Sequence, residues 1–136
     1  MKYLVDANVL SEPTKSEPSA RVMEWLARHE RELVVNPIVL GELEFGILKL
    51  AGGRRKSRLS EWFKQAPRRL RVLEIDHDTA RVWAGLLASL SRKGRTMPVT
   101  DSLIAATALQ YHLAVATRNL RDYAHAGVQV VDPFAG

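Results

Sequence analysis

The sequence contains no cysteine, which excludes several classes of protein and of site at once. A chain without cysteine has no disulfide framework, no thiolate zinc site and no cysteine nucleophile. A bound metal ion must then be held by oxygen or imidazole ligands. The absence of cysteine also fits a cytoplasmic location, because disulfides belong mainly to oxidising compartments.

Long apolar runs are also lacking. The apolar run at the amino terminus is interrupted by Asp6, too early for the apolar segment of a signal peptide. The longest uncharged stretch, 102–117, contains Gln110, Tyr111 and His112. It is shorter than the roughly 20 apolar residues that span a bilayer. We therefore expect neither secretion nor a membrane span.

The composition is that of a globular protein with an excess of positive charge. Of the 136 residues, 46% are hydrophobic and 26% are charged, which indicates one folded domain rather than a disordered chain. The formal net charge of +5 is typical of proteins that bind polyanions. Much of the positive charge lies in three clusters, which are Arg54, Arg55, Lys56 and Arg58; Arg68, Arg69 and Arg71; and Arg92, Lys93 and Arg95. Each cluster is equally explained as a solvated helix end or loop.

Short apolar segments alternate with helical patterns along the chain. Strands are predicted at 2–5, 33–35, 71–75, 113–117 and 128–131, and helices around 22–26 and over 37–50, 58–65, 82–90 and 102–110. The sequence further predicts a turn at 11–13, a helix end at Pro67, and a helix cap at Thr100 or Asp101. Strands that alternate with helices indicate a mainly parallel sheet of four to five strands, covered on both faces, in a single α/β domain over 1–136.

Polar side chains follow four of the predicted strands. Because ligands of open parallel sheets bind beyond the carboxyl ends of the strands, these side chains are the first candidates for chemistry. They are Asp6, Asn36, Glu42, Asp76, Thr117, Asn119 and Asp122, and Asp101 joins them at the amino end of a buried helix. Each also has a structural explanation as a turn, loop or cap residue. Helical spacing alone does not choose between Glu42 and Glu44.

Carboxylates that converge on one sheet edge repel one another unless they are protonated or neutralised by a cation. Hard oxygen ligands favour Mg²⁺ or Mn²⁺, and the four histidines are scattered along the chain. An acidic metal site on a basic protein is suited to phosphodiester hydrolysis, because the metal activates water while Lys and Arg hold the flanking phosphates. These residues do not by themselves choose between RNA and DNA.

Four motifs occur in order along nearly the whole chain. They are VDANVLSE at 5–12, GELEFG at 41–46, TDSLIAATA at 100–108 and TRNLRDY at 117–123. Together they resemble the motifs of PIN-domain ribonucleases of the VapC and FitB toxin type. The resemblance implies a PIN-like three-layer sandwich, with a central sheet flanked by helices, and an endoribonuclease that acts as the toxin of a toxin–antitoxin pair.

The resemblance also implies roles for individual residues and partners. The acidic pocket for Mg²⁺ or Mn²⁺ would consist of Asp6, Glu42, Asp101 and Asp122, which selects Glu42 over Glu44. The carboxylates and metal-bound water would be oriented by Asn8, Thr117 and Asn119. Candidates for contacts with RNA are Arg54, Arg55, Lys56 and Arg118. Family members usually form homodimers and are silenced by a cognate antitoxin of the VapB type, which also binds operator DNA.

Two other functions compete with this one. A non-catalytic nucleic-acid-binding or regulatory subunit would use the basic clusters and leave the carboxylates structural. A phospho-acceptor receiver domain also places an aspartate after a parallel strand, but it needs paired acids after the first strand and a late lysine. Loss of metal-dependent RNA cleavage on changing Asp6 would separate the ribonuclease from both alternatives.

Overall fold

The computed structural model describes residues 1–66 and 69–135, so the predicted helix end at Pro67 and the basic residue Arg68 lie outside the described residues. Within these ranges five strands form one all-parallel sheet in the order β3-β2-β1-β4-β5. The strands are β1 (Tyr3–Val5), β2 (Leu33–Val35), β3 (Arg71–Val72), β4 (Ala114–Ala116) and β5 (Val130–Val131). The predicted parallel sheet is confirmed.

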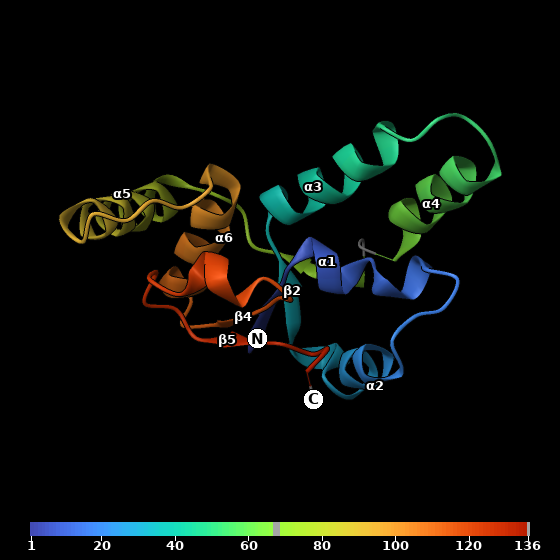
Figure 1. Cartoon of the computed structure of the whole chain (residues 1–136), viewed down its shortest axis with the longest axis horizontal. Helices are drawn as coiled ribbons and strands as arrows, with labels where there is room; N and C mark the ends of the chain where they lie inside the picture. Colours follow the sequence, from blue (N-terminus) through green and yellow to red (C-terminus); the bar gives the residue numbers. More distant parts are fainter. Residues whose placement is uncertain (67–68, 136) are drawn as a thin grey trace.

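Helices connect the strands and flank the sheet, as predicted. They are α1 (Ala7–Leu10), α2 (Ala20–Arg28), α3 (Pro37–Leu48), α4 (Arg54–Gln65), α5 (His77–Arg92) and α6 (Val99–Gln110), with shorter 3₁₀ turns η1 (Glu12–Thr14), η2 (Glu30–Glu32) and η4 (Leu120–Tyr123). Figure 1 shows α3 and α4 on one side of the strands, α5 and α6 on the other, and α2 below them near the C-terminus. No helix within the described ranges is long and apolar enough to cross a membrane.

The core lies between the central strands and the helices that cover them. Every residue of β1, β2 and β4 is buried. Helix α6 adds an uninterrupted buried run at 104–108, because small residues allow it to pack closely on the sheet. Helix α3 buries Val39, Leu43 and Ile47, which are spaced four residues apart and therefore share one face.

Several predicted boundaries are wrong. Helix α4 begins at Arg54 rather than at residue 58, so the first basic cluster forms its opening turns instead of a loop. Helix α3 ends at Leu48, before the predicted end at residue 50. A 3₁₀ helix occupies most of the predicted turn at 11–13. The N-cap of α6 is Pro98, which places Asp101 inside the first turn of this helix rather than at its cap.

Candidate active site

The site lies where the order of the strands reverses, between the neighbouring strands β1 and β4. Crevices at such a reversal, beyond the carboxyl ends of the strands, are the usual ligand sites of open α/β sheets. Asp6 follows β1 and Thr117 follows β4. The Thr117 hydroxyl donates a hydrogen bond of 2.8 Å to Asp6 Oδ2, so the two strand ends are joined at the site.

Asp6 is the most enclosed of the candidate carboxylates. Its side chain is held by the backbone N–H of Ala7, which donates to Oδ1 at 2.8 Å, and by Asn8 Nδ2, which donates to Oδ2 at 3.3 Å. The first of these bonds caps α1. Burial raises the pKa of Asp6 although these hydrogen bonds oppose the rise.

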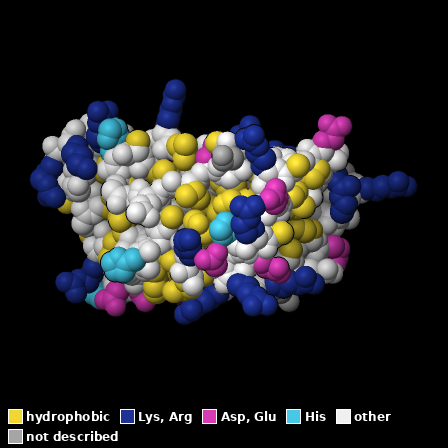
Figure 2. All heavy atoms as spheres, turned by 90° about the horizontal axis from the view of Figure 1, so that it is seen from below, with side chains coloured by type: hydrophobic (Ala, Val, Ile, Leu, Met, Phe, Trp, Pro, Cys, Tyr) yellow, Lys and Arg dark blue, Asp and Glu magenta, His cyan; other side chains and the backbone are white. Residues whose placement is uncertain are grey.

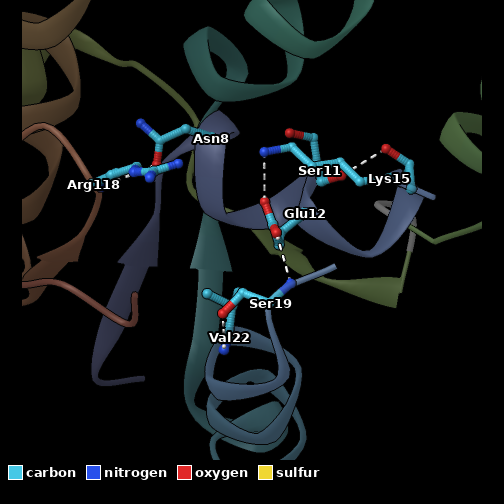
Figure 3. A network of polar contacts seen from close by, with 8 residues as sticks. Asn8, Ser11, Glu12, Lys15, Ser19, Val22 and Arg118 are labelled. Carbon is cyan, nitrogen blue, oxygen red and sulfur yellow. Dashed lines mark hydrogen bonds and ion pairs between the residues drawn. The ribbon is translucent and has the colours of Figure 1, made fainter. Parts of the chain in front are cut away.

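Asn8 joins the two halves of the site. Its Oδ1 accepts the backbone N–H of Arg118 at 3.1 Å, as Figure 3 shows, and its Nδ2 lies 3.4 Å from the Thr117 hydroxyl. The backbone N–H of Asn119 also donates to Thr117 Oγ1, at 3.0 Å. The predicted orienting residues therefore do surround Asp6, but Asn119 makes this contact through its backbone while the residue itself is exposed.

Two half-buried carboxylates from different helices complete the inner part of the site. Burial, followed by the charges of Asp6 and Asp101, raises the pKa of Glu42 on α3 to about 7. Burial, followed by the charges of Asp6 and Asp122, raises the pKa of Asp101 on α6 to about 6. The carboxyls are therefore close enough to disfavour one another's ionisation. By contrast, Glu44 is exposed.

A buried asparagine fixes the two helices that carry Glu42 and Asp101. Asn36 is fully buried, and its Oδ1 accepts the backbone N–H of Val39 at 3.0 Å, which caps α3. Its Nδ2 donates to Thr107 Oγ1 on α6, also at 3.0 Å. Both ends of the amide are thus used for structure, and Asn36 is a positioning element rather than a candidate for chemistry.

The outer carboxylates have different roles. Asp122 lies on η4 and is exposed, yet its charge contributes to the raised pKa of both Asp6 and Asp101. Asp76 follows the edge strand β3 and caps α5, where its Oδ1 accepts the backbone N–H of Thr79 at 2.9 Å. That backbone bond is the main reason why the pKa of Asp76 is lowered. Asp76 is therefore a helix cap and not part of the site.

One buried carboxylate was missed by the sequence analysis, which treated residue 12 as part of a turn. Glu12 is 3% exposed and accepts the backbone N–H of Ser19 at 2.8 Å, while Lys15 Nζ pairs with it at the same distance. Figure 3 shows these contacts joining η1 to the start of α2.

A groove of about 270 Å³ opens beside the acidic residues. Asn8 and Glu42 lie in its lining, together with apolar side chains of α3 and α4 that include Leu43, Leu59 and Trp62. Two basic residues, Lys15 and Arg55, also line the groove. Glu42 is therefore reachable from a surface that has both apolar and positively charged parts.

The predicted RNA contacts lie outside the acidic centre. Arg54 and Arg55 are exposed on the first turn of α4, whereas Lys56 is half-buried and donates to the carbonyl oxygen of Leu48 at 3.2 Å. The Arg118 guanidinium lies 4.5 Å from the centre of the Phe134 ring. Figure 2 shows Lys and Arg side chains distributed around the outline of the face seen from below.

The donor set fits a hard divalent cation. Glu42 Oε1 is buried and has no hydrogen-bond partner within the described residues. No three acidic or histidine side chains in these ranges form a ready-made cage for a metal ion. Mg²⁺ does not require one, because it usually keeps several water ligands and takes one or two carboxylates from the protein. Carboxylates with raised pKa and an unpaired buried oxygen are suited to such a partly hydrated ion.

Comparisons with known proteins agree with this geometry. Residues 3–128 match the PIN domain family. The toxin FitB of Neisseria gonorrhoeae is 33% identical over 135 residues, 96% of this chain and 97% of that protein. The VapC ribonuclease Y4jK of Sinorhizobium fredii is 33% identical over 136 residues, 96% of each chain. The crystal structure of DNA-bound VapBC from Salmonella typhimurium aligns with a TM-score of 0.86 at 27% identity, covering 98% of both chains.

Proposed function

Because the chain belongs to the PIN domain family and is similar to VapC and FitB toxins over nearly its whole length, we propose that it is the endoribonuclease toxin of a toxin–antitoxin pair. The observation that carries the proposal is the gathering of Asp6, Glu42, Asp101 and Asp122 around the ends of β1 and β4. A non-catalytic nucleic-acid-binding subunit would gain nothing from carboxylates that repel both one another and phosphate.

We infer that Mg²⁺ or Mn²⁺ binds among these four residues, directly to one or two of the carboxylates and to the others through its water ligands. Such an ion would supply an activated water and charge neutralisation at the scissile phosphate. Asp6 is kept in one orientation by its bonds to Ala7 and Thr117, so it is ready to ligate without rearrangement. Asn8 and Thr117 would orient this carboxylate, a task on which metal affinity commonly depends.

Cleavage of total cellular RNA by the purified, partner-free protein tests the proposed function. We expect discrete fragments with Mg²⁺ or Mn²⁺ and none with EDTA. The Asp6→Asn variant should lose at least about 100-fold in rate, because losing a ligand costs more than the 10–100-fold typical of an orienting residue. Asp78→Asn, at an exposed position on α5, is the matched control and should cleave like wild type. Metal-independent binding without cleavage would support the binding-subunit alternative instead.

We propose that RNA phosphates are held by Arg54, Arg55, Lys56 and Arg118. The first three belong to α4, whose Arg55 also lines the groove next to Glu42, so a strand lying in the groove would pass both. Each phosphate contact to single-stranded RNA contributes about 0.7 to the slope of log affinity against log salt.

Arg55→Gln should therefore weaken RNA binding and reduce this slope by about 0.7. Arg92→Gln is the control, because this exposed arginine lies at the far end of α5 and should leave the slope unchanged. Binding would be measured by fluorescence anisotropy in EDTA from 50 to 300 mM salt. Equal slopes for Arg55→Gln and wild type would remove Arg55 from the RNA-binding surface.

The proposed partners are an antitoxin of the VapB type and a second copy of the chain. The similar VapBC structure from Salmonella typhimurium is DNA-bound. This supports an antitoxin that binds operator DNA while in complex with the present chain. A homodimer is supported by Phe45 and Leu48 on α3, which are 63% and 62% exposed. A monomeric mass by light scattering at all concentrations tested would contradict the dimer. RNA as substrate also makes the cytoplasm the expected location.

A further inference from the structure

The hydroxyl of Tyr123 has no role in the site as described so far. Tyr123 is the last residue of η4, is 1% exposed, and belongs to the apolar core. Its Oη is buried and has no hydrogen-bond partner within residues 1–66 and 69–135. Buried hydroxyls almost always have a partner, so an unpaired one in a native fold calls for a functional explanation.

The surroundings of this hydroxyl are acidic. Besides burial, the charges of Asp6, Asp101, Glu42 and Asp122 all act on the Tyr123 phenol and raise its pKa. The hydroxyl is therefore a neutral donor among four acceptors. Helix α6, which carries Asp101 in its first turn, packs against η4. In agreement with this packing the Tyr123 hydroxyl lowers the pKa of Asp101, although the two side chains form no hydrogen bond in this structure.

Asp101 also needs a donor more than Asp6 does. The oxygens of Asp6 accept bonds from Ala7, Asn8 and Thr117. No side-chain or backbone group of the described residues donates a hydrogen bond to Asp101 in this structure, and the like-charged Asp122 lies close enough to raise its pKa. A carboxylate on the first turn of a helix with no donor is free to rotate about its side-chain torsions.

We propose that Tyr123 is a positioning residue whose hydroxyl, unpaired in this structure, donates a hydrogen bond to the Asp101 carboxylate when the divalent cation is bound and so fixes that carboxylate for ligation. This inference rests on the proposed function, since it assigns a partner to one of the proposed ligands. The strand–helix connection at 117–123 thereby contributes twice: Thr117 orients Asp6, and Tyr123 orients Asp101. Both bonds come from neutral donors, which leave the negative charge of the carboxylates available to the ion.

Direct Mn²⁺ binding to the full chain, measured by calorimetry, tests the inference. Tyr123→Phe keeps the buried ring and removes only the hydroxyl, and we expect Mn²⁺ affinity to fall by about 10-fold with no loss of thermal stability. Tyr3→Phe is the matched control: it removes the hydroxyl of a buried tyrosine that stacks on Trp25 and His29, and it should leave Mn²⁺ affinity unchanged.

A double variant tests whether Tyr123 acts through Asp101. If it does, adding Tyr123→Phe to Asp101→Asn should cause no further loss of Mn²⁺ affinity. Wild-type affinity in Tyr123→Phe, or equal additional losses in both backgrounds, would overturn the inference while leaving the ribonuclease proposal intact. Failure of the wild-type chain to bind Mn²⁺ would overturn both.

Discussion

Glu42→Gln is expected to abolish RNA cleavage, with a loss of at least about 100-fold, whereas Glu44→Gln should stay within about twofold of wild type. The two glutamates are two residues apart on α3, and the substitutions are chemically identical. Only Glu42 faces Asp6 and Asp101 and has a buried, unpaired carboxylate oxygen. Glu44 is exposed, so its charge is solvated and contributes little to the site.

This pair of variants separates loss of a ligand from loss of the fold. Glu42→Gln removes a charge that two neighbouring carboxylates disfavour, so the variant should be at least as heat-stable as wild type without metal. Rates would be measured by end-labelled RNA cleavage in Mg²⁺, with circular dichroism melts on the same samples. Equal activity of the two variants would show that Glu42 is not a ligand.

The metal-free protein should become less stable as the pH rises from about 5 to 8. The pKa values of Glu42 and Asp101 are raised from 4.5 and 3.8 to about 7 and about 6, so the folded chain holds protons that the unfolded chain has released. The stability that these two groups contribute is fully present below about pH 4 and is lost as the pH passes through their folded-state pKa values. Glu12 and Asp76 have lowered pKa values, so the stability that they contribute is lost as the pH falls. That loss occurs in more acidic solution, below the range of this prediction.

Mn²⁺ should reverse this loss at pH 8, because the ion takes the place of the protons. At a free concentration 100 times its Kd it adds about 2.7 kcal/mol to the free energy of unfolding. For a chain of this length that raises Tm by about 8 °C. Melts at pH 5 and pH 8, with and without Mn²⁺, would measure both effects. The prediction fails if Mn²⁺ shifts Tm equally in wild type and in Glu42→Gln.

Most of the fold could be predicted because its central strands are short apolar runs that end in polar residues. The strand predicted at 2–5 ends at Val5, as β1 does, and the strand predicted at 113–117 ends one residue earlier than expected, at Ala116. The start of α4 could not be predicted in this way. Arg54 and Arg55 follow two glycines, which favour a loop, yet arginine is a good helix former and begins the helix directly after its N-cap Gly53.

The site was harder to predict because periodicity does not reveal strand order. Asp6 and Asp76 both follow predicted strands, but β1 is central and β3 lies at the sheet edge. Only Asp6 therefore meets the other carboxylates. Tyr123 was hidden for a different reason: an aromatic residue that fits an apolar pattern is read as core, and the position of its hydroxyl depends on how η4 packs. The resemblance to PIN ribonucleases supplied the choice of Glu42 that spacing left open.

The bond between Asp6 and Thr117 also bears on how the protein folds as it is synthesised. The two residues are 111 positions apart in the chain, so the link closes one of the longest loops in the protein. Contacts of such long range form late, because the entropy of closing the loop opposes them until the intervening segments have folded. A nascent chain whose β4 has not yet emerged from the ribosome contains Asp6 and Glu42. It lacks the strand end that holds Asp6. During translation the acidic site therefore forms last, when the C-terminal strands join the sheet.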